Sequence, residues 1–344
     1  MAISYSVSIG AASFANEGRD ARPLLGIETE VGLGGGGGWC LIRLGDPSWG
    51  DPAIGDPLSV ELDAGEGKTT VFTGEVEGVE RRATALWIRG RDALAKLART
   101  EVEGSYEEAS AGFIVGDLID QAGADKGEIE EGPTFPSYVV HRGPRALRHI
   151  QVLAELIGVE TGSDGEGKVH FRKPKPAGAA DHRLVWGEDL LEIAIERSAT
   201  PVDSFVLWGE GAGGSKGAER SHWLPTDLSG VTGEAKVEPG ATAGEVGSVS
   251  PGSRGPLVRT VFAGAVRSSD VAGELAKARA ELLALRPLLG HCSLLGRPEV
   301  QPGEWIELAD LPTGEDGSAT LTLRARRVSH HFAIERGLLT RLEF

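Results

Sequence analysis

The sequence has little of what several common protein classes require. Its 344 residues include two cysteines, Cys40 and Cys292, which are too few for a disulfide framework. We expect both to be small buried hydrophobic residues of a chain made in a reducing compartment. No stretch approaches the ~18 consecutive apolar residues of a membrane-spanning helix. The first twenty residues have neither a charged start nor an apolar run of about 7–15 residues, so we expect no secretory signal.

Positive charge is also scarce. The chain carries 51 acidic residues against 35 lysines and arginines, for a net charge of −16. Proteins that bind nucleic acid or anionic membranes need clustered basic residues to contact phosphate groups. We therefore expect no nucleic-acid binding and no membrane insertion.

Glycine is abundant, with 50 residues, roughly double the usual share of ~7%. Many glycines indicate many turns and therefore many short strands. The length corresponds to about two or three domains at ~150 residues each. Alternating apolar residues predict a first meander of strands, typical of a small barrel or sandwich, at 4–9, 24–31, 39–44, 58–62, 71–80 and 84–89.

Helices follow this meander. Short helical stretches are expected over 92–98 and 113–121. A helix over 145–158 has an apolar face, and Gly158 is a suitable left-handed cap. The strongest helix covers Val271–Arg286, with Asp270 as its expected cap and Pro287 as its stop. Further strands are expected at 168–172, 184–186, 193–197, 202–208, 257–263, 291–296, 304–308, 321–328 and 334–344.

These patterns predict a mainly β protein with an α/β insertion. The expected domains are a first β-barrel over 1–94, an α/β insertion domain over 95–183 and a second β-barrel over 184–344. The last contains a long glycine-rich excursion over 209–255. A turn and strand at 54–62 is echoed at 301–308, and each is followed by a polar hairpin tip and two more strands. Duplication and the ordinary similarity of hairpins explain this echo equally well.

Each motif that suggests chemistry departs from the pattern that the chemistry requires. Residues 64–69 resemble the end of a phosphate-binding loop, but Leu62 stands where its first glycine belongs and the next residues alternate like a strand. His330 and His331 are adjacent in a strand, so they point to opposite faces and cannot chelate one ion. The other histidines lack metal-ligand spacing: His141, His149, His170, His182, His222 and His291.

Other catalytic patterns are equally weak. The acidic runs 75–80 and 101–108 fit solvated faces, and neither cysteine has an activating context. No nucleophile elbow of the GxSxG type occurs. Core packing is the expected role of the tryptophans, rather than a sugar platform: Trp39, Trp49, Trp87, Trp186, Trp208, Trp223 and Trp305. We predict no catalytic, cofactor-binding or metal-binding residue.

One resemblance covers nearly the whole chain through the order of its segments. They are Gly55–Leu58 with Phe72–Val76, Gly90–Leu94, Phe113–Ile119, Arg145–Gly158 with Asp164-Gly165, Ala276–Leu285, Gly296–Pro298, Gln301–Glu304 and Val328–His330. In this order the chain resembles the baseplate hub proteins of contractile tails. That family includes phage late-control D proteins, the hub portion of type VI spike proteins and the hubs of extracellular contractile injection systems.

The resemblance implies two tube-like β-barrels flanking the insertion and assembly into a homotrimer with pseudo-sixfold symmetry. Such a ring would join a threefold spike to the sixfold inner tube. Its partners would be a separate spike protein, because no spike domain follows in this sequence, the tube protein and baseplate wedge or adaptor proteins. The chain would assemble in the cytoplasm and end up in a phage tail or injection particle.

Two other functions remain open. One is a tail-associated cell-wall hydrolase, which needs a pair of carboxylates ~5–10 Å apart that sequence alone cannot place. The other is a carbohydrate-binding β protein that uses exposed tryptophans. The structural hub would be no enzyme, and an acidic lumen would repel acidic cargo.

Overall fold

Alternating strands dominate the first part of the chain, as the sequence predicts. The computed structural model describes residues 3–16, 24–176, 178–197, 202–210, 230–238, 257–285, 288–312 and 319–344. The first strands are β1 (Ser4–Ile9), β2 (Ala12–Ala15), β3 (Leu24–Gly32), β4 (Trp39–Leu44), β5 (Pro57–Asp63), β6 (Thr69–Arg81) and β7 (Leu86–Arg91). Their buried residues alternate with half-exposed ones, which is the pattern of a sheet with one face on a core.

A compact α/β unit follows β7. It contains α1 (Ala93–Arg99), β8 (Gly104–Ser110), α2 (Ala111–Gln121), β9 (Lys126–Ile129), β10 (Thr134–Val140), α3 (Ala146–Ile157), β11 (Glu160–Ser163) and β12 (Val169–Arg172). Gly158 ends α3 with a φ of 71°, which confirms the predicted left-handed cap.

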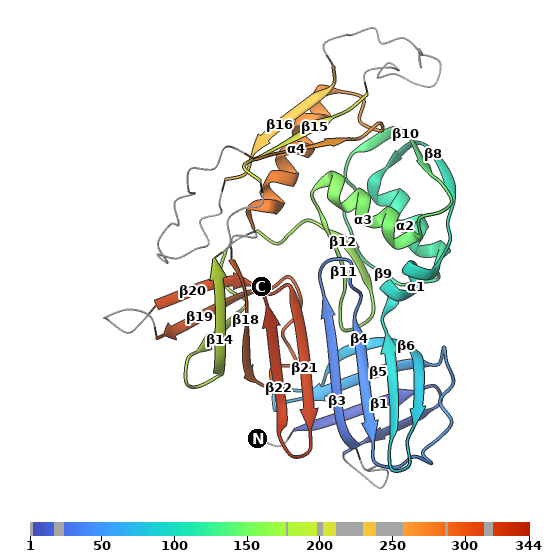
Figure 1. Ribbon diagram of the computed structural model, residues 1–344, viewed down its shortest axis with the longest axis vertical. Helices are drawn as coiled ribbons and strands as arrows, with labels where there is room; N and C mark the ends of the chain where they lie inside the picture. The colour runs from blue at the N-terminus through green and yellow to red at the C-terminus, as the bar shows by residue number, and fades with distance from the viewer. Residues whose placement is uncertain are drawn as a thin grey trace.

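The remaining elements complete the second half. They are β13 (His182–Val185), β14 (Leu190–Arg197), β15 (Ser204–Trp208), β16 (Thr232–Lys236), β17 (Val258–Phe262), α4 (Ser269–Ala284), β18 (Leu288–Leu295), β19 (Trp305–Leu311), β20 (Ala319–Arg324), β21 (Arg327–Ala333) and β22 (Gly337–Glu343). Strands β15–β17 form a small sheet against α4 at the far end of the molecule (Figure 1).

One open sheet runs through both halves of the chain. Its order is β14-β18-β22-β21-β3-β4-β7-β6-β5-β1-β2. Strand β21 pairs antiparallel with β3 from Arg327 opposite Gly32 to Ala333 opposite Gly26, so residues about 300 apart in sequence lie side by side (Figure 1). The mainly β prediction is confirmed, but the barrels are not closed, because the second edge of β21 is bonded to β3 instead of closing its own half.

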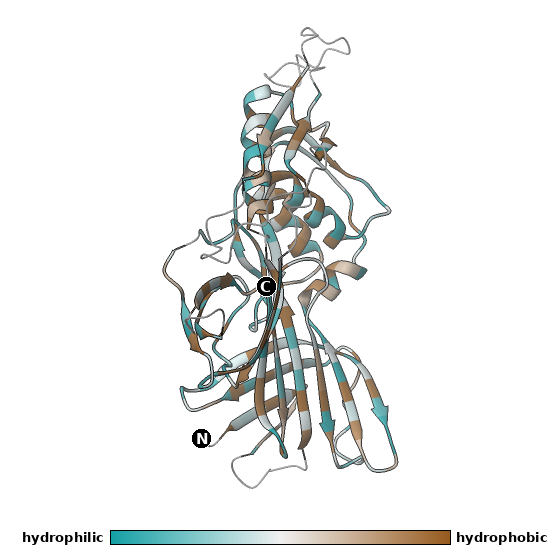
Figure 2. Cartoon of the chain, turned by 60° about the vertical axis from the view of Figure 1, so that its left-hand side comes forward, coloured by the Kyte–Doolittle hydropathy of each residue, from teal (hydrophilic) through white to brown (hydrophobic). Residues whose placement is uncertain are grey.

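Separate cores support the parts of this sheet. One forms beneath β1–β7 around residues such as Phe72 and Ile88, and a second forms beneath β18–β22 around Leu308 and Leu342. A third lies among the helices of the α/β unit and reaches α4. Bands of hydrophobic and hydrophilic residues alternate along the strands, and the helices gather at the opposite end of the molecule (Figure 2). Within the described residues, no helix is long and apolar enough to cross a bilayer.

Asp92 connects the α/β unit to the first half. The carboxylate is 2% exposed and accepts hydrogen bonds from the backbone of Gly38 and Leu94 and from the Ser163 hydroxyl. It caps α1 and at the same time holds the glycine loop before β4 and the end of β11. Burial raises its pKa despite these bonds. One side chain therefore positions three elements.

The two halves repeat the same strand pattern. In chain order, the equivalents of β3, β4 and β5 are β14, β18 and β19. Strand β6 corresponds to β20 and β21 together, and β7 corresponds to β22. The antiparallel pairings β3–β4, β4–β7, β6–β7 and β5–β6 recur as β14–β18, β18–β22, β21–β22 and β19–β20. Strand β13 departs from the pattern, because it pairs parallel to β19 while β1 pairs antiparallel to β5.

Local irregularities recur as well. Strands β3 and β14 both bulge at the second residue of a Leu-Leu pair, so that Leu25 and Leu191 are 50% and 52% exposed. The preceding leucines, Leu24 and Leu190, are buried opposite Leu44 and Leu294. Bulges are positional features of a sheet, so a shared bulge supports duplication.

The turns before β5 and β19 also match. In the first half, the Gly55 backbone donates to Val76 O at 2.8 Å and the Val76 backbone donates to Asp56 O at 2.9 Å. In the second half, Gly303 donates to Ala325 O at 2.7 Å and Ala325 donates to Glu304 O at 2.9 Å. Both glycines have a positive φ, 93° and 97°. The carboxylates of Asp56 and Glu304 each accept from the backbone three residues earlier at 2.8 Å. The sequence echo thus marks a repeated substructure, which favours duplication.

Several sequence expectations were wrong in detail. The N-cap of α4 is Ser268 rather than Asp270, and the expected strand over 321–328 is divided between β20 and β21. Strand β16 lies within the predicted excursion over 209–255, most of which falls outside the described residues. The two-stranded sheet of β8 and β10 was not predicted, because β8 is short and its acidic residues resemble a solvated run.

A buried histidine lies at the joint between the halves. His330 is opposite Thr29 on β3 and Thr340 on β22, and its Nδ1 is 3.0 Å from Thr340 Oγ1. Burial lowers its pKa from 6.5 to about 3, with a smaller contribution from His331. The folded state therefore holds the neutral ring, and stability is lost as pH falls below 6.5 because the unfolded chain binds the proton more tightly.

We predict that His330→Asn flattens the loss of stability in acid. The wild type should lose about 1.4 kcal/mol per pH unit from this group below the ordinary histidine pKa. Urea unfolding at a series of pH values measures the difference, with His331→Asn as the matched control. Parallel pH profiles for wild type and His330→Asn would contradict the prediction.

Candidate functional site

Both cysteines are too deeply buried to act as nucleophiles. Cys40 lies in the core under β1–β7 and Cys292 in the core under β18–β22. Burial raises the pKa of both thiols, that of Cys292 to about 12. A reactive cysteine needs a lowered pKa and access to solvent. Both therefore act as the small buried side chains expected from the sequence.

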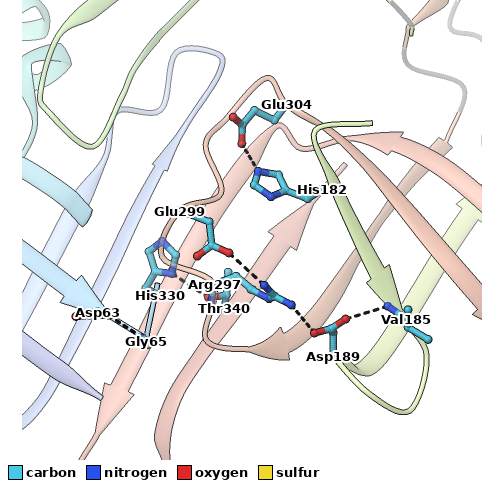
Figure 3. A network of polar contacts seen from close by, with 10 residues as sticks. All are labelled: Asp63, Gly65, His182, Val185, Asp189, Arg297, Glu299, Glu304, His330 and Thr340. Atoms are coloured by element: carbon cyan, nitrogen blue, oxygen red, sulfur yellow. Dashed lines mark hydrogen bonds and ion pairs between the residues drawn. The ribbon is translucent and has the colours of Figure 1, made fainter. Parts of the chain in front are cut away.

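The segment that resembles a phosphate-binding loop is the hairpin tip between β5 and β6. The Asp63 carboxylate accepts a hydrogen bond from the backbone of Gly65 at 2.7 Å (Figure 3). It also accepts one from the backbone of Gly67 at 3.1 Å. Those amides would have to face the phosphate in a nucleotide site. Thr69 then starts a strand instead of a helix. The tip is an acidic turn.

His170 on β12 and His149 on α3 are each held by hydrogen bonds within the α/β unit. His170 Nε2 is 2.8 Å from Asp164 and its Nδ1 accepts from the Glu128 backbone at 3.0 Å, so neither ring nitrogen is available as a base. His149 contacts the His141 carbonyl at 3.2 Å. Across the described ranges, no three metal-binding side chains are grouped. His222 lies outside those ranges.

A basin of about 910 Å³ lies where the first half, the α/β unit and the second half meet. Asp164 and Glu304 both line it. The Asp164 carboxyl is partly buried, yet hydrogen bonds from His170 and the Lys168 backbone hold its pKa below the usual range. A carboxylate kept ionised in this way cannot serve as the general acid of a glycosidase.

Glu304 acts as a structural acceptor at the same basin. It lies 2.9 Å from His182 Nε2 (Figure 3). It also accepts a hydrogen bond from the Gln301 backbone at 2.8 Å. Nearby, Arg297 bridges Asp189 at 2.6 Å and Glu299 at 3.5 Å. These contacts tie the turns of the second half together.

Exposed tryptophan faces are scarce in the described ranges. Trp49 and Trp305 are buried, and the Arg82 guanidinium lies 3.4 Å over the Trp87 ring. Trp208 is 46% exposed on β15, and Trp223 lies outside the described residues. This arrangement gives little support to a sugar platform.

A continuous polar surface is the most extended candidate. On the side of the shared sheet away from the two cores, ion pairs connect neighbouring strands. Arg43 meets Glu28 at 2.7 Å, Arg89 meets Glu80 at 3.0 Å and Arg91 meets Glu77 at 3.0 Å. Across the joint, Arg327 approaches Glu30 at 3.4 Å and Glu343 at 3.7 Å. We call these strands' outer side the charged face.

Solved structures with this architecture are tail proteins. The chain matches the 43 kDa tail protein of prophage MuSo2 from Shewanella oneidensis at a TM-score of 0.67 and 15% identity, over 99% of this chain and 98% of that one. It matches a tail protein from Neisseria meningitidis MC58 at 0.70 and 13%, over 100% and 96%. This chain has the fold of phage tail proteins.

The fold also extends to type VI secretion. An E. coli protein described as a component of the type VI secretion system matches at a TM-score of 0.57 and 12% identity, over 98% of this chain and 75% of that one. No family model and no curated protein matches the sequence. The resemblance predicted from the sequence is thus confirmed at the level of the fold, at identities of 12–15%.

The ion pair of His182 and Glu304 leads to a pH-dependent prediction. Its hydrogen bond to Glu304 raises the pKa of His182 above 6.5, so the pair stabilises the fold below that pH and the gain disappears as pH rises through the folded pKa. Glu304→Gln keeps an acceptor for the Gln301 backbone but removes the charge. We expect a loss of about 0.5–1 kcal/mol near pH 5.5 that shrinks near pH 8.5.

Asp56→Asn is the matched control, because Asp56 makes the same turn in the first half and no histidine bond to it is seen among the described residues. Denaturant unfolding of both variants at the two pH values measures the effect. An equal loss at both pH values for Glu304→Gln would show that the charge of His182 does not matter.

Proposed function

We propose that this chain is the structural baseplate hub of a phage tail or contractile injection apparatus, built as a homotrimeric ring between the spike and the inner tube. One observation carries the proposal: a duplicated strand pattern lies within a single continuous sheet. Three chains with two repeats each present six similar units around one axis. A threefold object can then meet a sixfold tube.

The charged face is suited to line the ring's channel. Its cross-strand ion pairs keep long side chains fixed against the sheet, and glutamates outnumber arginines among the residues of this face: Glu28, Glu30, Glu77, Glu80, Glu192, Glu196 and Glu343 against Arg43, Arg89, Arg91, Arg327 and Arg341. A wall with a small excess of negative charge would repel acidic cargo. A ring whose channel carries net positive charge would contradict this role.

The other units would serve the remaining partners. The proposed domains are 1–94 and 184–344 as ring-forming units and 95–183 as the insertion. The helices lie at the end of the molecule opposite the long strands (Figure 2). We propose that the strands meet the tube and that the insertion end meets a separate spike or the wedge and adaptor proteins. Assembly in the cytoplasm would precede incorporation into the particle.

The proposed hub performs no catalysis. The fold is that of phage tail proteins, and two carboxylates of the basin, Asp164 and Glu304, are each hydrogen-bonded to a histidine. Peptidoglycan cleavage by the purified chain, abolished by Asp164→Asn or Glu304→Gln, would favour the hydrolase instead.

We predict trimers in solution. Light scattering at increasing protein concentration should show mass rising to three times the 36.1 kDa of one chain. Negative-stain images of the same sample should show rings with apparent sixfold symmetry. A chain that stays monomeric at the highest soluble concentration, with no rings in the images, would overturn the proposed hub.

A further inference from the structure

The internal joint indicates how two copies of the chain would meet, if the proposed ring is right. Equivalent residues of the repeats form matching rows across the strands. Val79, Ile88, Ile42 and Ile27 lie in register on β6, β7, β4 and β3. The second row lies on β21, β22, β18 and β14, and its members are Val328, Leu342, Cys292 and Ile193. These two rows establish which residues of one repeat are equivalent to which residues of the other.

The joint between the repeats is made by the β21 edge of one and the β3 edge of the other. Val328 opposite Val31 is buried on the core side. On the charged face, Ser329 donates to Glu30 at 3.2 Å and Arg327 approaches the same carboxylate at 3.4 Å. A basic edge thus meets an acidic one.

The corresponding outer edges have no strand partner within the described chain. Strand β14, the equivalent of β3, pairs only with β18 there, and the 77–81 part of β6, the equivalent of β21, pairs only with β7. They lie on opposite sides of the lower part of the molecule (Figure 1). Val79 and Ile193 are only partly buried, while Val328 and Ile27 at the internal joint are fully buried. Open strand edges of this kind are ready to pair with another chain.

We propose that β14 of one copy pairs antiparallel with the end of β6 in the next copy, in the register of the internal joint. That register places Glu196 opposite Glu80 and Ile195 opposite Arg81. Strand β6 ends at Arg81, the equivalent of His330, so the joint between copies is shorter than the internal one.

Two arginines beside Glu80 offset its juxtaposition with Glu196 in this register. Glu80 is already held by Arg82 at 2.9 Å and Arg89 at 3.0 Å, so this end of the β6–β7 hairpin carries one excess positive charge. Glu196 is exposed on β14 at the position equivalent to Glu30. Entering beside the two arginines, it would neutralise the cluster, as Glu30 does for Arg327 inside the chain.

Disulfide trapping tests the register. A chain with Glu80→Cys and Glu196→Cys should form disulfide-linked dimers and trimers under mild oxidation, because directly opposite residues are close enough to be bridged. The matched control combines Glu80→Cys with Ala194→Cys, two positions along the same face, and should cross-link at least about tenfold less. Cys40 and Cys292 are buried and do not compete.

A charge reversal tests the edge without cysteines. Glu196→Lys should weaken association about tenfold or more, whereas Glu188→Lys, which reverses an exposed charge on the turn before β14, should associate like the wild type. Light scattering and ring images report both.

The outcomes separate this inference from the proposed function. Rings that form normally with Glu196→Lys, or trimers whose opposite cysteines do not cross-link, would overturn the strand pairing and leave the ring standing. A chain that forms no oligomer at all would overturn both. Cross-linking at the predicted pair, together with weakened rings for Glu196→Lys alone, is the expected result.

Discussion

The pairing of β3 with β21 is the contact on which the architecture depends. It joins strands from opposite ends of the chain through seven residue pairs and makes two repeats into one sheet. A slip of one residue in this pairing would turn Val31 and Val328 away from the cores. It would turn outward side chains such as Glu30 toward the cores instead. The hydrogen bond from Ser329 to Glu30 and the ion pair of Arg327 with the same carboxylate also favour this register, because a slip would separate these partners.

The insertions leave this sheet intact. The α/β unit enters after β7, and the unit of β15–β17 with α4 enters between β14 and β18, each at a strand end where no rung of the sheet is interrupted. Asp92 fastens the first insertion to the first half. Arg324 and Glu160, a buried ion pair at 2.6 Å, fasten it to the second half. Because a buried ion pair is costly to break, these contacts give the insertion a defined position on both repeats.

Groups that could carry chemistry serve the fold instead. Asp63 caps a hairpin tip, His170 joins a strand to a turn, and Glu304 holds a turn that Asp56 forms in the other repeat. The side chains of Asp63, His170 and Glu304 are therefore satisfied by neighbours.

Local periodicity determined much of the secondary structure. Strands such as Ser4–Ile9 and Trp39–Leu44 and the cap at Gly158 could be predicted because each depends on neighbours within a few residues. The choice of Ser268 over Asp270 as the α4 cap could not, since it depends on where the preceding chain leaves the helix. Nor could the union of β3 with β21, the open rather than closed sheet, or the shared bulges at Leu25 and Leu191. Pairing between residues about 300 apart is set by packing of the whole sheet, and no short window of sequence contains that information.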